Sequence, residues 1–181
     1  MRFLLAFLAF LLTASVPASV FADTTLSGVE GMTSTVFQQN QTSFSGLGAR
    51  VTFQSDALVP GIAFVPGIEF WRNRTHVDAY GITTNRRDAT LNLDGRYRFK
   101  FRGVAPYLGA GYGLHFLTTA VEAPALGLPR AETALTKGGV SALGGVLFPV
   151  GAKLQNFLEL KYDWVTDYRQ LKLNFGIGYG F

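Results

Sequence analysis

The chain has 181 residues, a formal net charge of +4, 21 glycines, 14% aromatic residues and no cysteine. This length suits one domain, and the lack of cysteine excludes disulfides and a lipid-modified N-terminal cysteine. The charge is too small and too scattered to indicate a nucleic-acid partner, whereas glycine and aromatic residues in short alternating segments are typical of a closed membrane β-sheet.

The N-terminus has the pattern of a secretory signal peptide. Arg2 precedes an apolar run from Phe3 to Leu12, and Val20 and Ala22 stand where a signal peptidase expects small or apolar residues. A helix needs about 20 apolar residues to cross a bilayer, and this run is shorter. We therefore expect residues 1–22 to be removed, leaving a domain of residues 23–181. An uncleaved membrane anchor is the alternative.

Beyond this leader, apolar and polar residues alternate with a period of two, which is the pattern of strands with two different faces. The first strand, within Leu26–Phe37, has the weakest pattern. Seven more segments alternate clearly, at 47–53, 64–71, 89–101, 108–116, 140–148, 158–164 and 171–181. The sequence thus predicts eight strands of about nine to eleven residues, the length that a tilted strand needs to cross a bilayer.

The predicted connections alternate in length. Long polar ones, at 38–45, 73–88 and 118–133, follow the first, third and fifth strands. Short ones, at 55–61, 102–105 and 149–154, follow the second, fourth and sixth. Outer-membrane barrels have long extracellular loops and short periplasmic turns, so the long side is predicted to be extracellular. The short link at 166–169 between the last two strands departs from this pattern.

Alternation alone does not distinguish a membrane barrel from a soluble lipocalin-like barrel or a sandwich. Here the apolar rows contain large aromatic residues, which would overfill a narrow eight-stranded interior. Glycine is frequent in the opposite rows, and Tyr97, Tyr162, Trp164 and Tyr179 stand near strand ends, where an aromatic girdle would lie. We predict an all-β, eight-stranded antiparallel up-and-down transmembrane β-barrel of the bacterial outer membrane.

Charged residues of the strands share the face opposite the apolar rows, which would be the lumen. Buried charges must be paired, so we expect them to form a network that plugs the lumen, with the individual pairings left open. Its predicted members are Arg50, Glu69, Asp94, Arg96, Arg98, Lys137, Glu159, Lys161, Asp163 and Lys172. His115 is expected to join the polar lumen.

The C-terminal segment Leu173–Phe181 resembles the terminal strand of bacterial outer-membrane barrels. In that family a final phenylalanine, with aromatic or apolar residues at alternate positions before it, is read by the barrel-assembly machinery; Phe175, Ile177, Tyr179 and Phe181 match this pattern. The segment 106–113 is similar to the fifth strand of OmpA-like and OmpX-like barrel domains. The resemblance implies export to the outer membrane and recognition by that machinery. The cell-wall tether of full-length OmpA-type proteins is not carried over.

Three classes of function fit these observations. The leading one is a structural or surface-interaction barrel with a plugged lumen, which would serve envelope integrity, adhesion or surface recognition. The second is a narrow pore for small solutes. The third is an enzyme that modifies lipid A, but a deacylase of this kind would need a histidine followed closely by serine and asparagine, and neither His76 nor His115 has that context.

We therefore expect no enzyme activity, no catalytic residue, no cofactor and no metal. His76 and Asp78 are interpreted as parts of a polar extracellular loop. The expected partners are outer-membrane lipid and lipopolysaccharide, and the barrel is expected to be a monomer. Arginine binds phosphate through two parallel hydrogen bonds. The candidate lipopolysaccharide contacts are Arg72, Arg74, Arg86 and Arg87.

Overall fold

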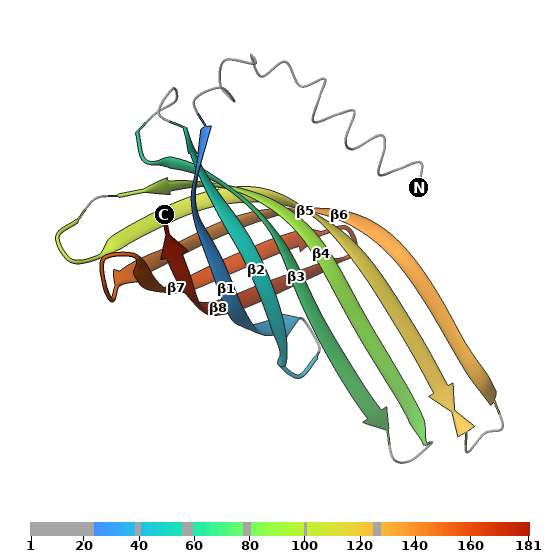
Figure 1. Cartoon of the computed structure of the whole chain (residues 1–181). Helices are drawn as coiled ribbons and strands as arrows, with labels where there is room; N and C mark the ends of the chain where they lie inside the picture. Colours follow the sequence, from blue (N-terminus) through green and yellow to red (C-terminus); the bar gives the residue numbers. More distant parts are fainter. Residues whose placement is uncertain (1–23, 39–40, 56–59, 78–80, 100, 125–127) are drawn as a thin grey trace, which may run out of the picture.

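The computed structural model describes residues 24–38, 41–55, 60–77, 81–99, 101–124 and 128–181, so the predicted signal peptide lies outside it. These residues form a closed barrel in which each strand pairs with its sequence neighbours and β1 pairs with β8 (Figure 1). Its eight strands are β1 (Thr24–Gln38), β2 (Phe44–Ser55), β3 (Ile62–Val77), β4 (Ile82–Arg98), β5 (Ala105–Ala123), β6 (Leu128–Pro149), β7 (Leu154–Val165) and β8 (Tyr168–Gly180). The described part of the chain contains no helix long and apolar enough to cross a membrane.

The seam between the first and last strands closes the barrel. β1 and β8 run antiparallel from the pair Gly28 and Gly180 to the pair Gln38 and Gln170. At the end of the chain the Phe181 amide donates a hydrogen bond to the Ser27 carbonyl over 3.1 Å. Closure pairs the backbone groups that a sheet edge would otherwise expose to hydrocarbon.

The two faces of the sheet confirm the predicted sidedness. Large apolar side chains point outward, and Leu160 and Phe175 are 49% and 54% exposed. The charged side chains of the same strands point inward, where Arg96 and Lys161 are buried. This inverts the arrangement of a soluble barrel, and it gives the molecule an apolar outer surface that matches a bilayer.

Short turns join the strands at the end where the C-terminus lies (Figure 1). β2 ends at Ser55 and β3 begins at Ile62, while β6 ends at Pro149 and β7 begins at Leu154, as predicted. At the opposite end Thr166 and Asp167 link β7 to β8, and Asp167 has a φ of 74°. Aspartate is one of the few residues besides glycine that tolerate this left-handed region.

The prediction of long loops at 73–88 and 118–133 is wrong. β3 and β4 form a continuous ladder up to the pair Val77 and Ile82, and β5 and β6 pair as far as Ala123 and Leu128. Cross-strand pairs of β-branched residues, such as Thr75 with Thr84 and Thr119 with Thr133, suit strands, and the ladder continues through most of both segments. Consequently β3 to β6 have 16 to 22 residues and extend well beyond the other four strands (Figure 1).

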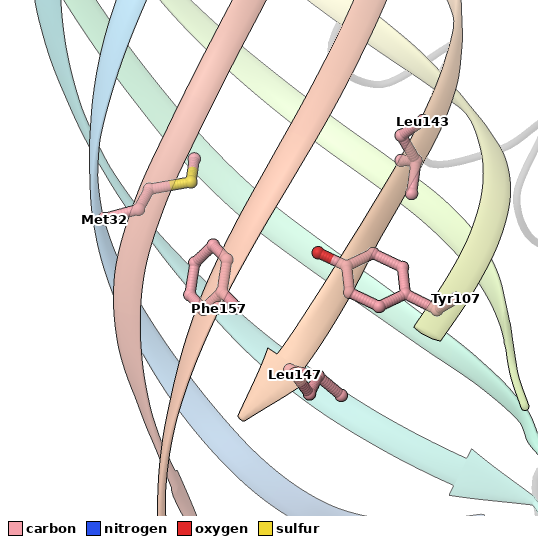
Figure 2. Close-up of a cluster of buried hydrophobic side chains, with 5 residues drawn as sticks. All are labelled: Met32, Tyr107, Leu143, Leu147 and Phe157. Atoms are coloured by element: carbon pink, nitrogen blue, oxygen red, sulfur yellow. The ribbon is translucent and has the colours of Figure 1, made fainter. Parts of the chain in front are cut away.

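Next to the charged residues the lumen contains an apolar cluster, here called the apolar floor, that the alternation pattern did not predict. Figure 2 shows its members converging from β1, β5, β6 and β7. They are Met32, Tyr107, Leu143, Leu147 and Phe157, all at most 5% exposed. Tyr107, Leu147 and Phe157 lie in the strand halves next to the short turns. Leu143 pairs with Lys161, and Met32 lies further from that end than Glu30, so the cluster also extends upward among the charged residues.

Candidate functional site: the polar lumen and the outer arginines

The lower layer of the lumen is a ring of alternating charges from four strands. Arg50 on β2 contacts Glu30 on β1 (Nε–Oε2, 3.2 Å) and Glu159 on β7 (Nη1–Oε1, 2.8 Å). Arg96 on β4 contacts the same two carboxylates over 3.1 and 3.0 Å. Each cation therefore lies between two anions, which offsets the large cost of burying an isolated charge.

This ring lies directly on the apolar floor. The Arg50 guanidinium stacks over the Phe157 ring at 4.8 Å from its centroid, and that of Arg96 lies 5.0 Å from the centroid of Tyr107. The Tyr107 hydroxyl donates a hydrogen bond to Glu159 over 2.9 Å. Cation–π contacts of this kind strengthen when the cation is desolvated, so floor and ring support each other.

A second layer uses lysines. The Lys161 ammonium donates to Asp94 (Nζ–Oδ2, 3.0 Å) and lies 3.5 Å from Glu69. Lys172 contacts Glu69 as well as Asp163, the latter over 2.9 Å. Gly111 on β5 faces this layer, because a Cβ there would meet the Asp94 carboxylate and the Ser141 hydroxyl. Glycine on the lumen face therefore makes room for the charged side chains.

A third group, nearer the outer end of the lumen, is formed by the buried Asp88, Thr90 and His115 together with the half-buried Tyr168. His115 Nδ1 lies 2.7 Å from Asp88 Oδ2 and 3.0 Å from Thr90 Oγ1. The Tyr168 hydroxyl donates to Asp88 over 3.4 Å. His115 thus joins the polar lumen, and no described cluster of three histidine or acidic side chains is arranged to hold a metal ion.

The structure brings most of the predicted network residues into two separate sets of contacts. One set contains Arg50, Arg96 and Glu159, and the other contains Glu69, Asp94, Lys161, Asp163 and Lys172. Lys137 joins neither set. It pairs over 2.7 Å with Asp167, whose side chain is 73% exposed in the outer turn. Arg98 lies half-buried at the end of β4, and no ion pair is seen for it among the described residues.

Two members of the lumen were missed by sequence reasoning. Glu30 lies on β1, where glycine and threonine weaken the apolar alternation, although Glu30 has the same parity as the buried Met32. Asp88 was assigned to a loop and is a fully buried strand residue. Asp88 is separated from Asp94 and Arg96 by an even number of residues, so all three side chains point to the same face of β4. A prediction that started this strand before Asp88 would therefore have placed Asp88 in the lumen.

The four predicted lipopolysaccharide contacts are divided between two faces. Arg72, Arg74 and Arg87 are exposed on the outer face of β3 and β4. Arg86 has the opposite parity, which it shares with the buried Asp88, so it lies on the face that continues the lumen wall. The prediction grouped the four arginines because it assigned them to a loop. In a strand, adjacent side chains point to opposite faces of the sheet, so Arg86 and Arg87 are separated.

The C-terminal residues lie on the lipid-facing surface. Phe175, Ile177, Tyr179 and Phe181 are all exposed on the outer face of β8 and its final residue. Tyr179 and Phe181 pack edge to face with their centroids 5.7 Å apart, near the short-turn end of the barrel.

No family model and no curated protein sequence matches the chain. Solved structures do match its fold. A major outer membrane protein from Thermus thermophilus has a TM-score of 0.69 at 13% identity, with 86% of this chain and 99% of that chain covered. Neisserial surface protein A has a TM-score of 0.66 at 17% identity, with 87% and 99% covered.

The attachment invasion locus protein of Yersinia pestis, in complex with the heparin analogue sucrose octasulfate, has a TM-score of 0.60 at 12% identity, with 87% and 98% covered. At these identities the likeness concerns the fold, and the outward apolar surface of the closed barrel independently requires a membrane. The chain is therefore an outer-membrane protein with the fold of the small OmpA-like and OmpX-like β-barrels.

Proposed function

We propose that this protein is a surface-interaction barrel with a non-conducting lumen, and that the extended sheet of β3 to β6 binds an extended segment of a partner protein. The observation that carries this proposal is the unequal strand length. β6 pairs with β7 only from Gly139 onward, whereas its ladder with β5 reaches Leu128. Within the described chain, residues 128–137 of β6 therefore have a strand neighbour on one side only.

The second edge of the same sheet is also open. β3 pairs with β2 as far as Trp71, and residues 72–77 continue beside β4 alone within the described residues. Open edges present a row of backbone donors and acceptors to which another strand can add. Val121 and Leu135 expose 38% and 52% of their surface on the concave side of this sheet, and they would contribute apolar contacts.

The buried layers support the proposal of a closed lumen. An eight-stranded interior is just wide enough for side chains to fill, and here Asp94, Glu159, Lys161 and Lys172 are at most 1% exposed. The apolar floor lies beneath them. In a planar bilayer the purified protein should give no stable single-channel current, and a steady open current would favour the alternative of a narrow pore.

The named roles of two similar structures fit a surface function. One is a surface protein of Neisseria and the other an attachment protein of Yersinia pestis. An enzyme role has no support among the described side chains, since His76 is exposed beside Thr83 and His115 is buried beside Asp88. Mass spectra of lipid A from cells that express the protein should be unchanged, and a lost or added acyl chain would contradict this part of the proposal.

The edge itself can be tested with one substitution. The Gly138 carbonyl accepts a hydrogen bond from the Thr166 amide, so it points away from β5. Backbone groups alternate in direction along an antiparallel strand, and Ala134 therefore directs its amide to the open edge. Ala134→Pro removes this donor and leaves the ladder with β5 intact, because proline is tolerated on edge strands.

The matched control is Ala134→Val, which keeps the amide. Bacteria that display each form at equal surface levels would be compared for attachment to cultured epithelial cells. We expect the wild type and Ala134→Val to attach and Ala134→Pro to lose most of the attachment. Equal attachment by the two variants, or none by the wild type, would refute the proposed edge-binding role.

A further inference from the structure

Three arginines form a cluster on the outer face of the barrel, just beyond its lipid-facing band. Arg72 and Arg74 follow Phe70 on the outward side of β3, and Arg87 precedes Leu91 on the outward side of β4. Phe70 and Leu91 are 49% and 42% exposed and belong to the surface that faces hydrocarbon. The guanidinium groups therefore lie at the level where lipid headgroups begin.

The cluster places positive side chains next to each other, and none of the described carboxylates lies between them. Arg72 and Arg87 are direct cross-strand partners, and Arg74 is opposite Asn85. Arg72 donates a hydrogen bond to the Asn85 side chain over 3.0 Å, but no described acidic side chain lies within ion-pair distance of the three arginines. Like charges in directly opposite positions destabilise a sheet pair, so an external anion would relieve a repulsion already present.

A nearby arginine provides the contrast. Arg130 lies on the outward face of β6 between two acids, Glu122 at 3.3 Å and Glu132 at 2.8 Å. Among the described residues, the same extended sheet thus places one arginine between two acids and leaves three others without an acidic partner. A general shortage of acidic residues on this part of the surface therefore does not explain why Arg72, Arg74 and Arg87 have no acidic partner.

A groove on the lipid-facing wall begins at Arg72 and crosses the strands from β3 over β2, β1 and β8 to β7. It has a volume of about 500 Å³, and Arg72 lies at its outer end. It is lined by the small residues Thr33, Thr35 and Ser45 together with the bulkier Leu47, Phe70 and Phe175. A hydrocarbon chain fits such a depression, since its lining is mainly apolar and it faces the bilayer.

We propose that the arginine cluster and this groove form a binding site for a phosphorylated, acylated glycolipid of the outer leaflet. The guanidinium groups of Arg72, Arg74 and Arg87 would bind its phosphates through paired, charge-assisted hydrogen bonds. One acyl chain would lie in the groove. Arg72 and Arg74 belong to the open segment 72–77 of β3, but the site uses their outward side chains. The edge-binding proposal concerns backbone groups and is tested at Ala134 on β6, so the two proposals can hold or fail independently.

The charge arm of the test uses the full-length protein in lipid nanodiscs, titrated with bis-phosphorylated lipid A and observed by native mass spectrometry. The variant Arg72→Gln/Arg74→Gln/Arg87→Gln should bind at least tenfold more weakly than the wild type. Arg86→Gln is the matched control for Arg87→Gln, because it removes the same charge from the neighbouring residue on the opposite face. Arg87→Gln alone should weaken lipid A binding, whereas Arg86→Gln should bind lipid A as the wild type does. An equal loss of binding in these two single variants would overturn the proposal.

The ligand arm needs no variant and therefore holds even if the triple substitution impairs folding. Wild-type protein should bind dephosphorylated lipid A, phosphatidylglycerol and inorganic phosphate much more weakly than the bis-phosphorylated form. Equal binding of dephosphorylated lipid A would show that the arginines do not act on phosphate. Equal binding of phosphatidylglycerol would overturn the assignment to a glycolipid. Thr33→Leu, which narrows the groove, should also weaken binding, and unchanged affinity would exclude the groove.

Discussion

Replacing Glu159 by alanine should reveal how much the buried ring stabilises the barrel. The Glu159 carboxylate is fully buried and contacts Arg50 over 2.8 Å and Arg96 over 3.0 Å. It also accepts hydrogen bonds from Tyr107 and from Asn174. In Glu159→Ala the two guanidinium groups would share Glu30 alone, and two neutral donors would lose their acceptor.

The expected cost follows from what is left behind. Removing one partner of a buried ion pair typically destabilises a protein by about 3–5 kcal/mol, because an uncompensated charge stays in the interior. The two neutral hydrogen bonds add to this loss, while water entering the vacated space reduces it. We expect the free energy of unfolding to fall by about 4 kcal/mol. Glu159→Gln should lose less, because the amide oxygen still accepts a hydrogen bond.

Lys137→Ala is the control, since it breaks an ion pair of nearly the same length. Lys137 and Asp167 are 2.7 Å apart, but the Asp167 side chain is 73% exposed. An exposed pair contributes about 0–1 kcal/mol. Urea unfolding in lipid vesicles, followed by tryptophan fluorescence and by the gel shift between folded and boiled protein, measures both variants. A loss below about 1 kcal/mol in Glu159→Ala would refute the reasoning.

Three further predictions concern the lumen, the lipid face and assembly. Gly111→Ala should lose about 1–3 kcal/mol through overpacking against Asp94, whereas Gly151→Ala, whose Cβ would meet nothing within 4 Å, should be close to neutral in the same urea assay. Leu160→Arg places a charge on the outer face and should cost about 2–4 kcal/mol if that face lies in hydrocarbon; an unchanged unfolding midpoint would contradict the membrane assignment. Phe181→Ala should lower the fraction of folded barrel in outer-membrane preparations, as judged by the gel shift, while a normal fraction would argue against a terminal assembly signal.

The alternation of residues along the chain was enough to predict the number of strands, their two faces and the short turns. The pleat of a strand sends successive side chains to opposite sides, so the rows that contain Leu160 and Phe175 were separable from the rows that contain Lys161 and Asn174 without any coordinates. Closure and sidedness then followed from the need to pair backbone groups and charges within hydrocarbon.

Which charges meet, and where the strands end, depends on the folded barrel as a whole. The contact of Arg50 with Glu159 joins β2 to β7 across the lumen, and such pairs depend on the relative register of all eight strands, which no local pattern encodes. The extension of β3 to β6 was equally hidden, because outside the bilayer a polar segment can form either a loop or a ladder. Only the ladder assigns Arg86 and Arg87 to different faces, and with them the separation of the lumen wall from the outer arginine cluster.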